Sequence, residues 1–208
     1  MIKLFFDIET LPSADEHKEI HLEILRKKSK GTDEQLHLST SFEGTFGRIC
    51  CISIIKEGPQ GIILQETYSG EEKDILEKFW KTSIGVDRFV GHNIWGFDLP
   101  FIYKRSIING VKPRKLNLAR YRDIPIYDTM LQWELWNMKS AQKLDTLAKI
   151  FGLPTSKDEM DGSMVYDYFR QGKLEDICRY CMKDVELTRK VYYKMAFDDN
   201  NSQDDINF

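Results

Sequence analysis

Four acidic residues and one tyrosine, far apart in the chain, have the types and spacings that suit metal-dependent chemistry. Asp7 and Glu9 are two residues apart in FFDIET, so on a strand both side chains leave the same face, about 7 Å apart. Tyr180 and Asp184, in YCMKDVELT, are four residues apart and share one face of a helix. Asp98, in GHNIWGFDLPF, follows a point where a strand gives way to a helix, and sites collect at such strand ends in open α/β sheets.

If these carboxylates meet in one pocket, they need cations to offset their mutual repulsion. Mg²⁺ and Mn²⁺ prefer oxygen ligands, and two such ions about 4 Å apart could cut a phosphodiester bond. One ion would activate a water for in-line attack, and the other would stabilise the departing oxygen. Each piece alone has a simpler explanation: an exposed strand end for Asp7 and Glu9, a helix cap for Asp98, and a solvated pair for Tyr180 and Asp184.

Apolar runs predict the strands that would position these residues. Residues 2–8 are apolar and aromatic, which is typical of a strand buried on both faces. Residues 48–56 and 61–68, separated by a turn-forming EGPQ, predict an antiparallel hairpin, and residues 88–91 predict a further short strand. The expected sheet is mixed and five-stranded, an antiparallel meander plus parallel strands.

Residues at helical spacing predict the elements around the sheet. An amphipathic helix is expected after the first strand, a helix beginning near Asp98 in the middle of the chain, and mostly helix towards the end; the expected ranges are 13–30, 71–81, 99–109, 129–136, 144–151, 164–169 and 174–195. The class is therefore α/β, with helices flanking the sheet. We expect one domain over residues 1–196, followed by an acidic, disordered tail over residues 197–208.

Composition restricts the classes of protein. The chain is 41% hydrophobic and 30% charged, no stretch approaches the roughly 18 apolar residues of a membrane span, and the first residues lack a secretory signal. We therefore expect a soluble, cytoplasmic protein whose four cysteines, Cys50, Cys51, Cys178 and Cys181, are reduced. A net charge of -3 means that contact with nucleic acid has to be local or supported by bound cations.

Three segments together resemble a known family of enzymes. FFDIET, GHNIWGFDLPFIYKR and YCMKDVELTRKVYYKM are similar to the three motifs of the DEDDy branch of the ribonuclease H-like 3′-to-5′ exonucleases. The nearest likeness is to the proofreading domain of B-family DNA polymerases and its stand-alone relatives, and it extends over about residues 1–196, including SAQKLDTLAKIFGL between the second and third motifs. The resemblance implies a ribonuclease H-like fold and release of nucleoside 5′-monophosphates from 3′ ends.

The resemblance also implies a role for each motif residue. Asp7 would bridge two metal ions, Glu9 and Asp184 would bind the ion on the side of the attacking water, and Asp98 would act chiefly on the second ion through water. Tyr180 would hold the attacking water, because an unperturbed tyrosine pKa near 10 makes it a poor base at neutral pH.

Four further residues match family positions that contact the terminal nucleotides. They are Thr10, Leu11, Asn93 and Phe97, with Leu11 expected to wedge against the last base and Phe97 to line its pocket. Plain core packing is the alternative for Leu11 and Phe97.

The substrate is the least determined part of the hypothesis. Single-stranded or frayed DNA ends are preferred because the nearest likeness is to polymerase proofreading domains. RNA trimming is the closest alternative, since nothing in the sequence indicates recognition of a 2′-hydroxyl. A catalytically silent nucleic-acid or clamp-binding module and a small-nucleotide phosphodiesterase also stay open.

Two further segments could contact partners. Between positions 104 and 122 there are seven basic residues and no acid, with Tyr103 and Tyr121 nearby, so this stretch could bind phosphates and stack on bases, or be a solvated loop. The terminal QDDINF, from Gln203 to Phe208, resembles the peptides with which bacterial replication and repair enzymes dock on the sliding clamp, with Ile206 in place of the usual leucine. An inert acidic tail is the alternative.

Overall fold

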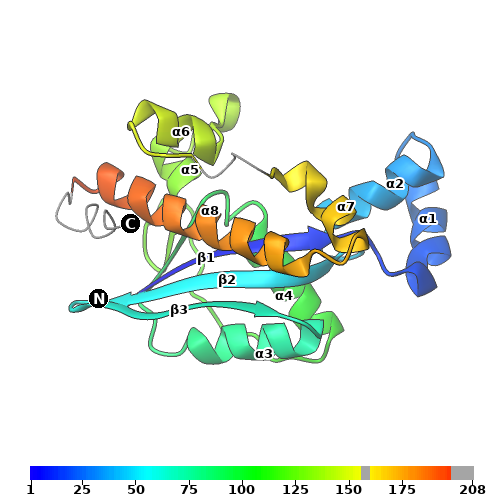
Figure 1. The fold of residues 1–208 in the computed structure, drawn as a ribbon, viewed down its shortest axis with the longest axis horizontal. Coiled ribbons are helices and arrows are strands. Elements are labelled where there is room, and N and C mark those ends of the chain that lie inside the picture. Colours follow the sequence, from blue (N-terminus) through cyan, green and yellow to red (C-terminus); the bar gives the residue numbers. More distant parts are fainter. Residues whose placement is uncertain (156–159, 198–208) are drawn as a thin grey trace.

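The computed structural model describes residues 1–155 and 160–197, and the strands among them form one mixed sheet. The strand order is β3-β2-β1-β4-β5 (Figure 1). β1 pairs antiparallel with β2 and β2 antiparallel with β3, whereas β1 with β4 and β4 with β5 are parallel. The predicted mixed five-stranded sheet is confirmed, with β1 (Lys3–Leu11), β2 (Arg48–Gly58), β3 (Gly61–Ser69), β4 (Arg88–Gly91) and β5 (Ile126–Asp128).

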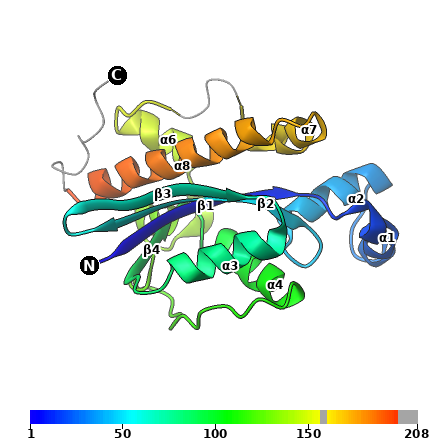
Figure 2. The same cartoon turned by 60° about the horizontal axis from the view of Figure 1, so that its bottom comes forward.

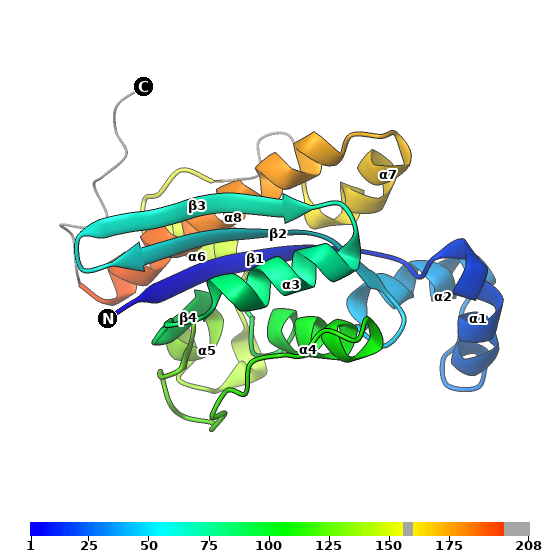
Figure 3. The same ribbon diagram turned by 90° about the horizontal axis from the view of Figure 1, so that it is seen from below.

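Helices cover both faces of this sheet. Figure 2 shows α3 and α4 below it and α6, α7 and α8 above it, and Figure 3 shows α1 and α2 beyond the far end of β1. The helices are α1 (Lys18–Arg26), α2 (Asp33–Ser39), α3 (Glu72–Thr82), α4 (Asp98–Ile108), α5 (Thr129–Trp133), α6 (Leu144–Ile150), α7 (Val165–Arg170) and α8 (Leu174–Met195).

Alternation along β1 divides the core into two sides. Leu4, Phe6 and Ile8 are buried in the cluster that contains the apolar residues of α3 and α4. Phe5 lies in the opposite cluster with Val185 of α8. Because side chains alternate along a strand, Asp7 and Glu9 follow Phe5 and leave β1 on the side of α8. The hydrophobic pattern of β1 therefore determines which helix the two acids face.

A buried charge network fixes α8 across the sheet. Glu57 of β2 is buried, and it accepts hydrogen bonds from Arg189 Nε, at 2.6 Å, and from the Tyr193 hydroxyl. Burial raises the pKa of Glu57, but these hydrogen bonds outweigh it and leave the pKa below its ordinary value. Since an unpaired buried charge is costly, the position of α8 that joins Arg189 to Glu57 is strongly favoured.

The structure differs from the sequence prediction at two places. Residues 13–30 form a short 3-10 turn (Asp15–His17) and then α1, and a separate α2 follows that the apolar pattern does not predict. A local signal for α2 exists, because Thr32 and Gln35 form a reciprocal capping box with bonds of 3.0 and 3.2 Å. β5 has no such signal, since three residues are too few to show a period.

None of the helices in the described part of the chain combines the length and apolar character needed to cross a membrane. The acidic tail is predicted to begin at Phe197. Its residues 198–208, which include the QDDINF segment, lie outside the described residues.

Candidate active site

Asp98 reaches the sheet at an open edge of β1. On β1, β4 pairs with Lys3, Leu4 and Phe5, whereas β1 continues to Leu11, so β1 extends beyond this parallel neighbour. There Ile8 N donates a hydrogen bond to Asp98 Oδ1 at 3.2 Å. Asp98 is 2% exposed, and its contact satisfies a strand amide that β4 does not reach.

Asp7 and Glu9 lie together against α8. The Cys181 thiol donates to the backbone oxygen of Asp7 at 3.4 Å and to its Oδ2 at 3.5 Å. Asp7, Glu9 and Cys181 each offer one possible ligand atom, and these atoms all lie within 4.8 Å of one another. Among the described residues, Asp98 and Asp184 fall outside this tightest group.

The electrostatics nevertheless join all four acids. Burial raises the pKa of Asp7 well above its ordinary value, and the charges of Asp98, Glu9 and Asp184 raise it further. Burial also raises the pKa of Glu9, and it raises that of Asp98 to about 8 in spite of backbone hydrogen bonds. Ionising this set without cations is therefore unfavourable, and its carboxylate oxygens fit hard divalent cations.

Tyr180 is buried one turn before Asp184 on α8. Burial, followed by the charges of Asp184 and Glu9, raises the pKa of its hydroxyl far above the ordinary value. The phenol therefore keeps its proton at neutral pH. Such a group can orient a bound water by hydrogen bonding, but it does not act as a base.

The four expected nucleotide contacts have different surroundings. Leu11 is buried in the cluster that contains Tyr180, and Thr10 Oγ1 donates to Ser41 O at 2.7 Å. Phe97 is half-buried, with its ring centroid 5.5 Å from that of Phe101. Packing thus accounts for part of the surface of Leu11 and Phe97, and their contact with nucleotides stays a prediction, as does that of Thr10 and Asn93.

The turn that leads from β4 to Asp98 has two unusual backbone positions. A Cβ at Gly91 would lie 2.0 Å from Ile94 Cγ2, so the close approach there requires a glycine, and Asn93 has a left-handed φ of 62°.

This turn also depends on Asp128, a residue that the sequence pattern does not single out. Asp128, at the end of β5, is 2% exposed and accepts hydrogen bonds from Asn93 N and Trp95 N, both at 2.9 Å, and from two amides of α5. An aspartate just before a predicted helix is a signal for an N-cap. Its hydrogen bonds to Asn93 N and Trp95 N, however, join segments far apart in the chain, which no local pattern predicts.

His92 lies beside this turn but has no spare ring nitrogen. Its Nδ1 is 2.9 Å from Thr129 Oγ1 and its Nε2 is 3.0 Å from Gln142 O. Burial lowers its pKa to about 4, so the imidazole is neutral and structural at physiological pH.

Comparison with known proteins agrees with this architecture. The chain resembles the structure of the family B DNA polymerase from the hyperthermophilic archaeon Pyrobaculum calidifontis, with a TM-score of 0.62 and 18% sequence identity over 95% of this chain. The match covers 24% of the polymerase, so the chain spans about a quarter of that protein. At this identity the likeness shows the fold, which confirms the predicted ribonuclease H-like α/β class. No curated protein matches.

A family model matches residues 40–206 and is described as a predicted 3′-5′ exonuclease related to the exonuclease domain of PolB. The matched range includes Asp98, Tyr180 and Asp184 and begins after Asp7 and Glu9, whose assignment depends on the motif and on the geometry of β1. Because the model covers most of the sequence, the chain belongs to this family of predicted 3′-5′ exonucleases related to the exonuclease domain of PolB.

Proposed function

We propose that this protein is a metal-dependent 3′-to-5′ exonuclease that releases nucleoside 5′-monophosphates from single-stranded or frayed DNA ends. The observation that carries the proposal is a cluster of carboxyl groups. Possible ligand atoms of Asp7 and Glu9 lie within 4.8 Å of each other, Asp98 is buried beside β1, and the charges of Asp98 and Asp184 both act on half-buried Asp7. Clustered acids whose joint ionisation is unfavourable without cations are what a site for divalent metals requires.

In this proposal the four acids hold two divalent cations, Mg²⁺ or Mn²⁺. Asp7 would bridge them, Glu9 and Asp184 would bind the first, and Asp98 would act chiefly on the second through water. When bound, the cations would acidify a water and stabilise the charge that develops on the departing 3′ oxygen.

Tyr180 would orient the attacking water through its hydroxyl group. Its raised pKa supports orientation rather than proton abstraction, because the phenolate is not populated near neutral pH. Thr10, Leu11, Asn93 and Phe97 would receive the terminal nucleotides beside the acids.

DNA is the proposed substrate because the solved structure that the chain resembles is a DNA polymerase. RNA trimming stays the nearest alternative, since no described feature is specific for a 2′-hydroxyl. We also propose a cytoplasmic location, which the four free cysteines support, because thiols stay reduced there.

Matched 5′-labelled DNA and RNA strands, incubated with Mg²⁺, Mn²⁺ or EDTA, test the proposal. The DNA strand should shorten stepwise from its 3′ end only when a metal is present. Faster shortening of RNA would favour the trimming alternative, and equal rates on dinucleotides and long strands would favour a phosphodiesterase.

Two substitutions on α8 provide the control. Asp184→Ala should abolish shortening, whereas Glu186→Ala, two residues further on, should not, because Glu186 accepts a hydrogen bond from Gln65 at 2.7 Å, away from the acids. Full activity of Asp184→Ala would overturn the assignment.

A further inference from the structure

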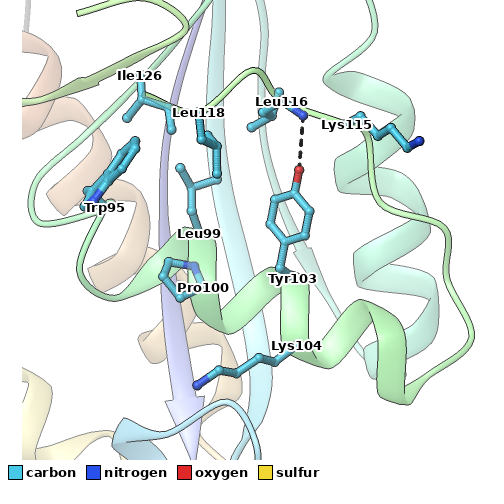
Figure 4. A pocket seen from close by; sticks show the side chains of 9 residues that line it. All are labelled: Trp95, Leu99, Pro100, Tyr103, Lys104, Lys115, Leu116, Leu118 and Ile126. Carbon is cyan, nitrogen blue, oxygen red and sulfur yellow. Dashed lines mark hydrogen bonds between the residues drawn. The ribbon is translucent and has the colours of Figure 1, made fainter. Parts of the chain in front are cut away.

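A cavity lies against α4, the helix that begins at Asp98. Its volume is about 670 Å³, and it opens between α4 and the segment that leads to β5 (Figure 4). Leu99, Leu116 and Ile126 supply apolar surface, and the rings of Trp95 and Tyr103 form walls. A cavity of this size and lining is typical of a site for a small, flat, largely apolar group.

The hydroxyl group of Tyr103 is already hydrogen-bonded within the protein. The Tyr103 hydroxyl donates to Arg114 O. It also accepts from Leu116 N at 3.3 Å (Figure 4). The Trp95 amide donates to Asp128. Tyr103 therefore presents its ring rather than its hydroxyl, which favours stacking as the mode of recognition.

The opening of the cavity is positively charged. Lys104 and Lys115 stand at its margin (Figure 4), and Lys115 is exposed together with Lys112, Arg120 and Arg122. The other basic residues of this stretch have internal partners: Lys104 pairs with Glu43, Arg105 with Glu72, and Arg114 donates to Ser83 O and Val86 O. The four exposed cations carry positive charge in a chain whose net charge is -3, so they suit a polyanion.

The cavity and the candidate active site share helix α4 and the turn before it. Leu99 follows Asp98 directly in α4, and Trp95 lies two residues before Phe97. Aromatic rings continue from the cavity towards solvent, since the Trp136 centroid lies 5.9 Å from Trp95 and 5.2 Å from Tyr121. One strand could thus contact both places.

We propose that this cavity binds an unpaired nucleobase of the substrate strand, upstream of the terminal nucleotide, while the exposed cations contact the strand's phosphates. The proposal rests on the proposed function and deepens it, because a base can enter the cavity only when it is unpaired. It predicts a preference for single-stranded over fully paired ends.

Binding of 5′-fluorescein oligothymidylates to the full chain in EDTA, followed by anisotropy, tests the proposal. An abasic spacer is moved one position at a time along the strand. A spacer at one internal position should weaken binding about 10-fold, the size expected for the loss of one stacked base.

Leu118→Glu places a charge in the cavity and should weaken binding of the unmodified strand by a similar factor and remove the effect of the spacer. Leu118 is 49% exposed, so the variant should fold. Ile107→Glu is the matched control, because Ile107 is 70% exposed on α4 and does not line the cavity. Lys115→Glu, at the margin, should also weaken binding. The proposal is overturned if every spacer position is tolerated equally and Leu118→Glu binds like Ile107→Glu.

A separate substrate distinguishes failure of this proposal from failure of the proposed function. The p-nitrophenyl ester of thymidine 5′-monophosphate is too short to reach from the acids into a second base site. If the wild-type protein hydrolyses it with Mg²⁺ while the spacer scan is flat, only the cavity proposal fails. If neither this ester nor any strand is hydrolysed, the proposed function fails.

Discussion

Asp128→Asn tests the inference that one buried carboxylate holds the turn leading to Asp98. Oδ1 of Asp128 accepts from Asn93 N at 2.9 Å and from two amides of α5 at 3.0 and 3.2 Å, while Oδ2 accepts from Trp95 N at 2.9 Å. An asparagine has only one side-chain oxygen. If this oxygen keeps the three hydrogen bonds that Oδ1 accepts, the NH₂ group replaces Oδ2, and two donors, the NH₂ group and the Trp95 N–H, then face each other. The loss of one hydrogen bond to a charged group, together with the weakening of the others, should cost about 3 kcal/mol of unfolding free energy.

Urea unfolding followed by circular dichroism measures this loss, and the melting temperature should fall by about 6 to 12 °C for a chain of this size. Asp87→Asn is the matched control. Oδ2 of Asp87 also accepts a hydrogen bond from a backbone amide, Ile2 N at 2.7 Å, but Asp87 is exposed, so water can replace this hydrogen bond. That variant should change stability by about 0.5 kcal/mol or less. Equal unfolding curves for both variants would refute the role given to Asp128.

Two further outcomes follow from the site, and a third concerns the terminal segment. Tyr180→Phe should lower the turnover number about 10-fold without moving the pH profile, because the phenol hydrogen-bonds water but does not titrate; complete loss of activity or a shifted profile would contradict this. In EDTA the unfolding free energy should fall between about pH 4 and about pH 8, because folded Asp98, with a pKa of about 8, keeps a proton that the unfolded chain, near 3.8, has released. Mg²⁺ or Asp98→Asn should flatten this decline, and stability that rises with pH in EDTA would contradict it. Finally, a calorimetric titration of a QDDINF peptide against the sliding clamp of the same organism separates the two interpretations of the tail: binding that Phe208→Ala abolishes would support docking, and no binding of the native peptide would leave the tail as an inert segment.

Local sequence patterns predict most of the elements of this fold. The apolar run in β1 and its period of two place Asp7 and Glu9 on one face, and the pair at Tyr180 and Asp184 correctly predicts a helix that presents them together. The fifth strand is predicted as a member of the sheet but not located, because β5 has three residues and no measurable period.

Contacts between distant segments explain what the sequence leaves undetermined. The entry of Asp98 beside Ile8 depends on β4 ending before β1 does, which is a property of strand pairing and not of either segment alone. Asp128 carries the signal of a helix cap, yet its hold on Asn93 joins residues 35 positions apart. Similarly, nothing local distinguishes Arg105, which pairs with Glu72, from the exposed cations of the same basic stretch.

The central claim is that clustered acids at the end of β1 hold the metals that cut a 3′ end, and Asp7→Ala tests it most directly. Wild-type and variant proteins, with unfolding curves recorded in parallel, are incubated with Mg²⁺ and a 5′-labelled single strand resolved to one nucleotide. The account predicts stepwise 3′ shortening by the wild type and a loss of about 10³-fold or more in the folded variant, since a metal contributes several kcal/mol to the transition state. Shortening by Asp7→Ala at the wild-type rate would contradict it.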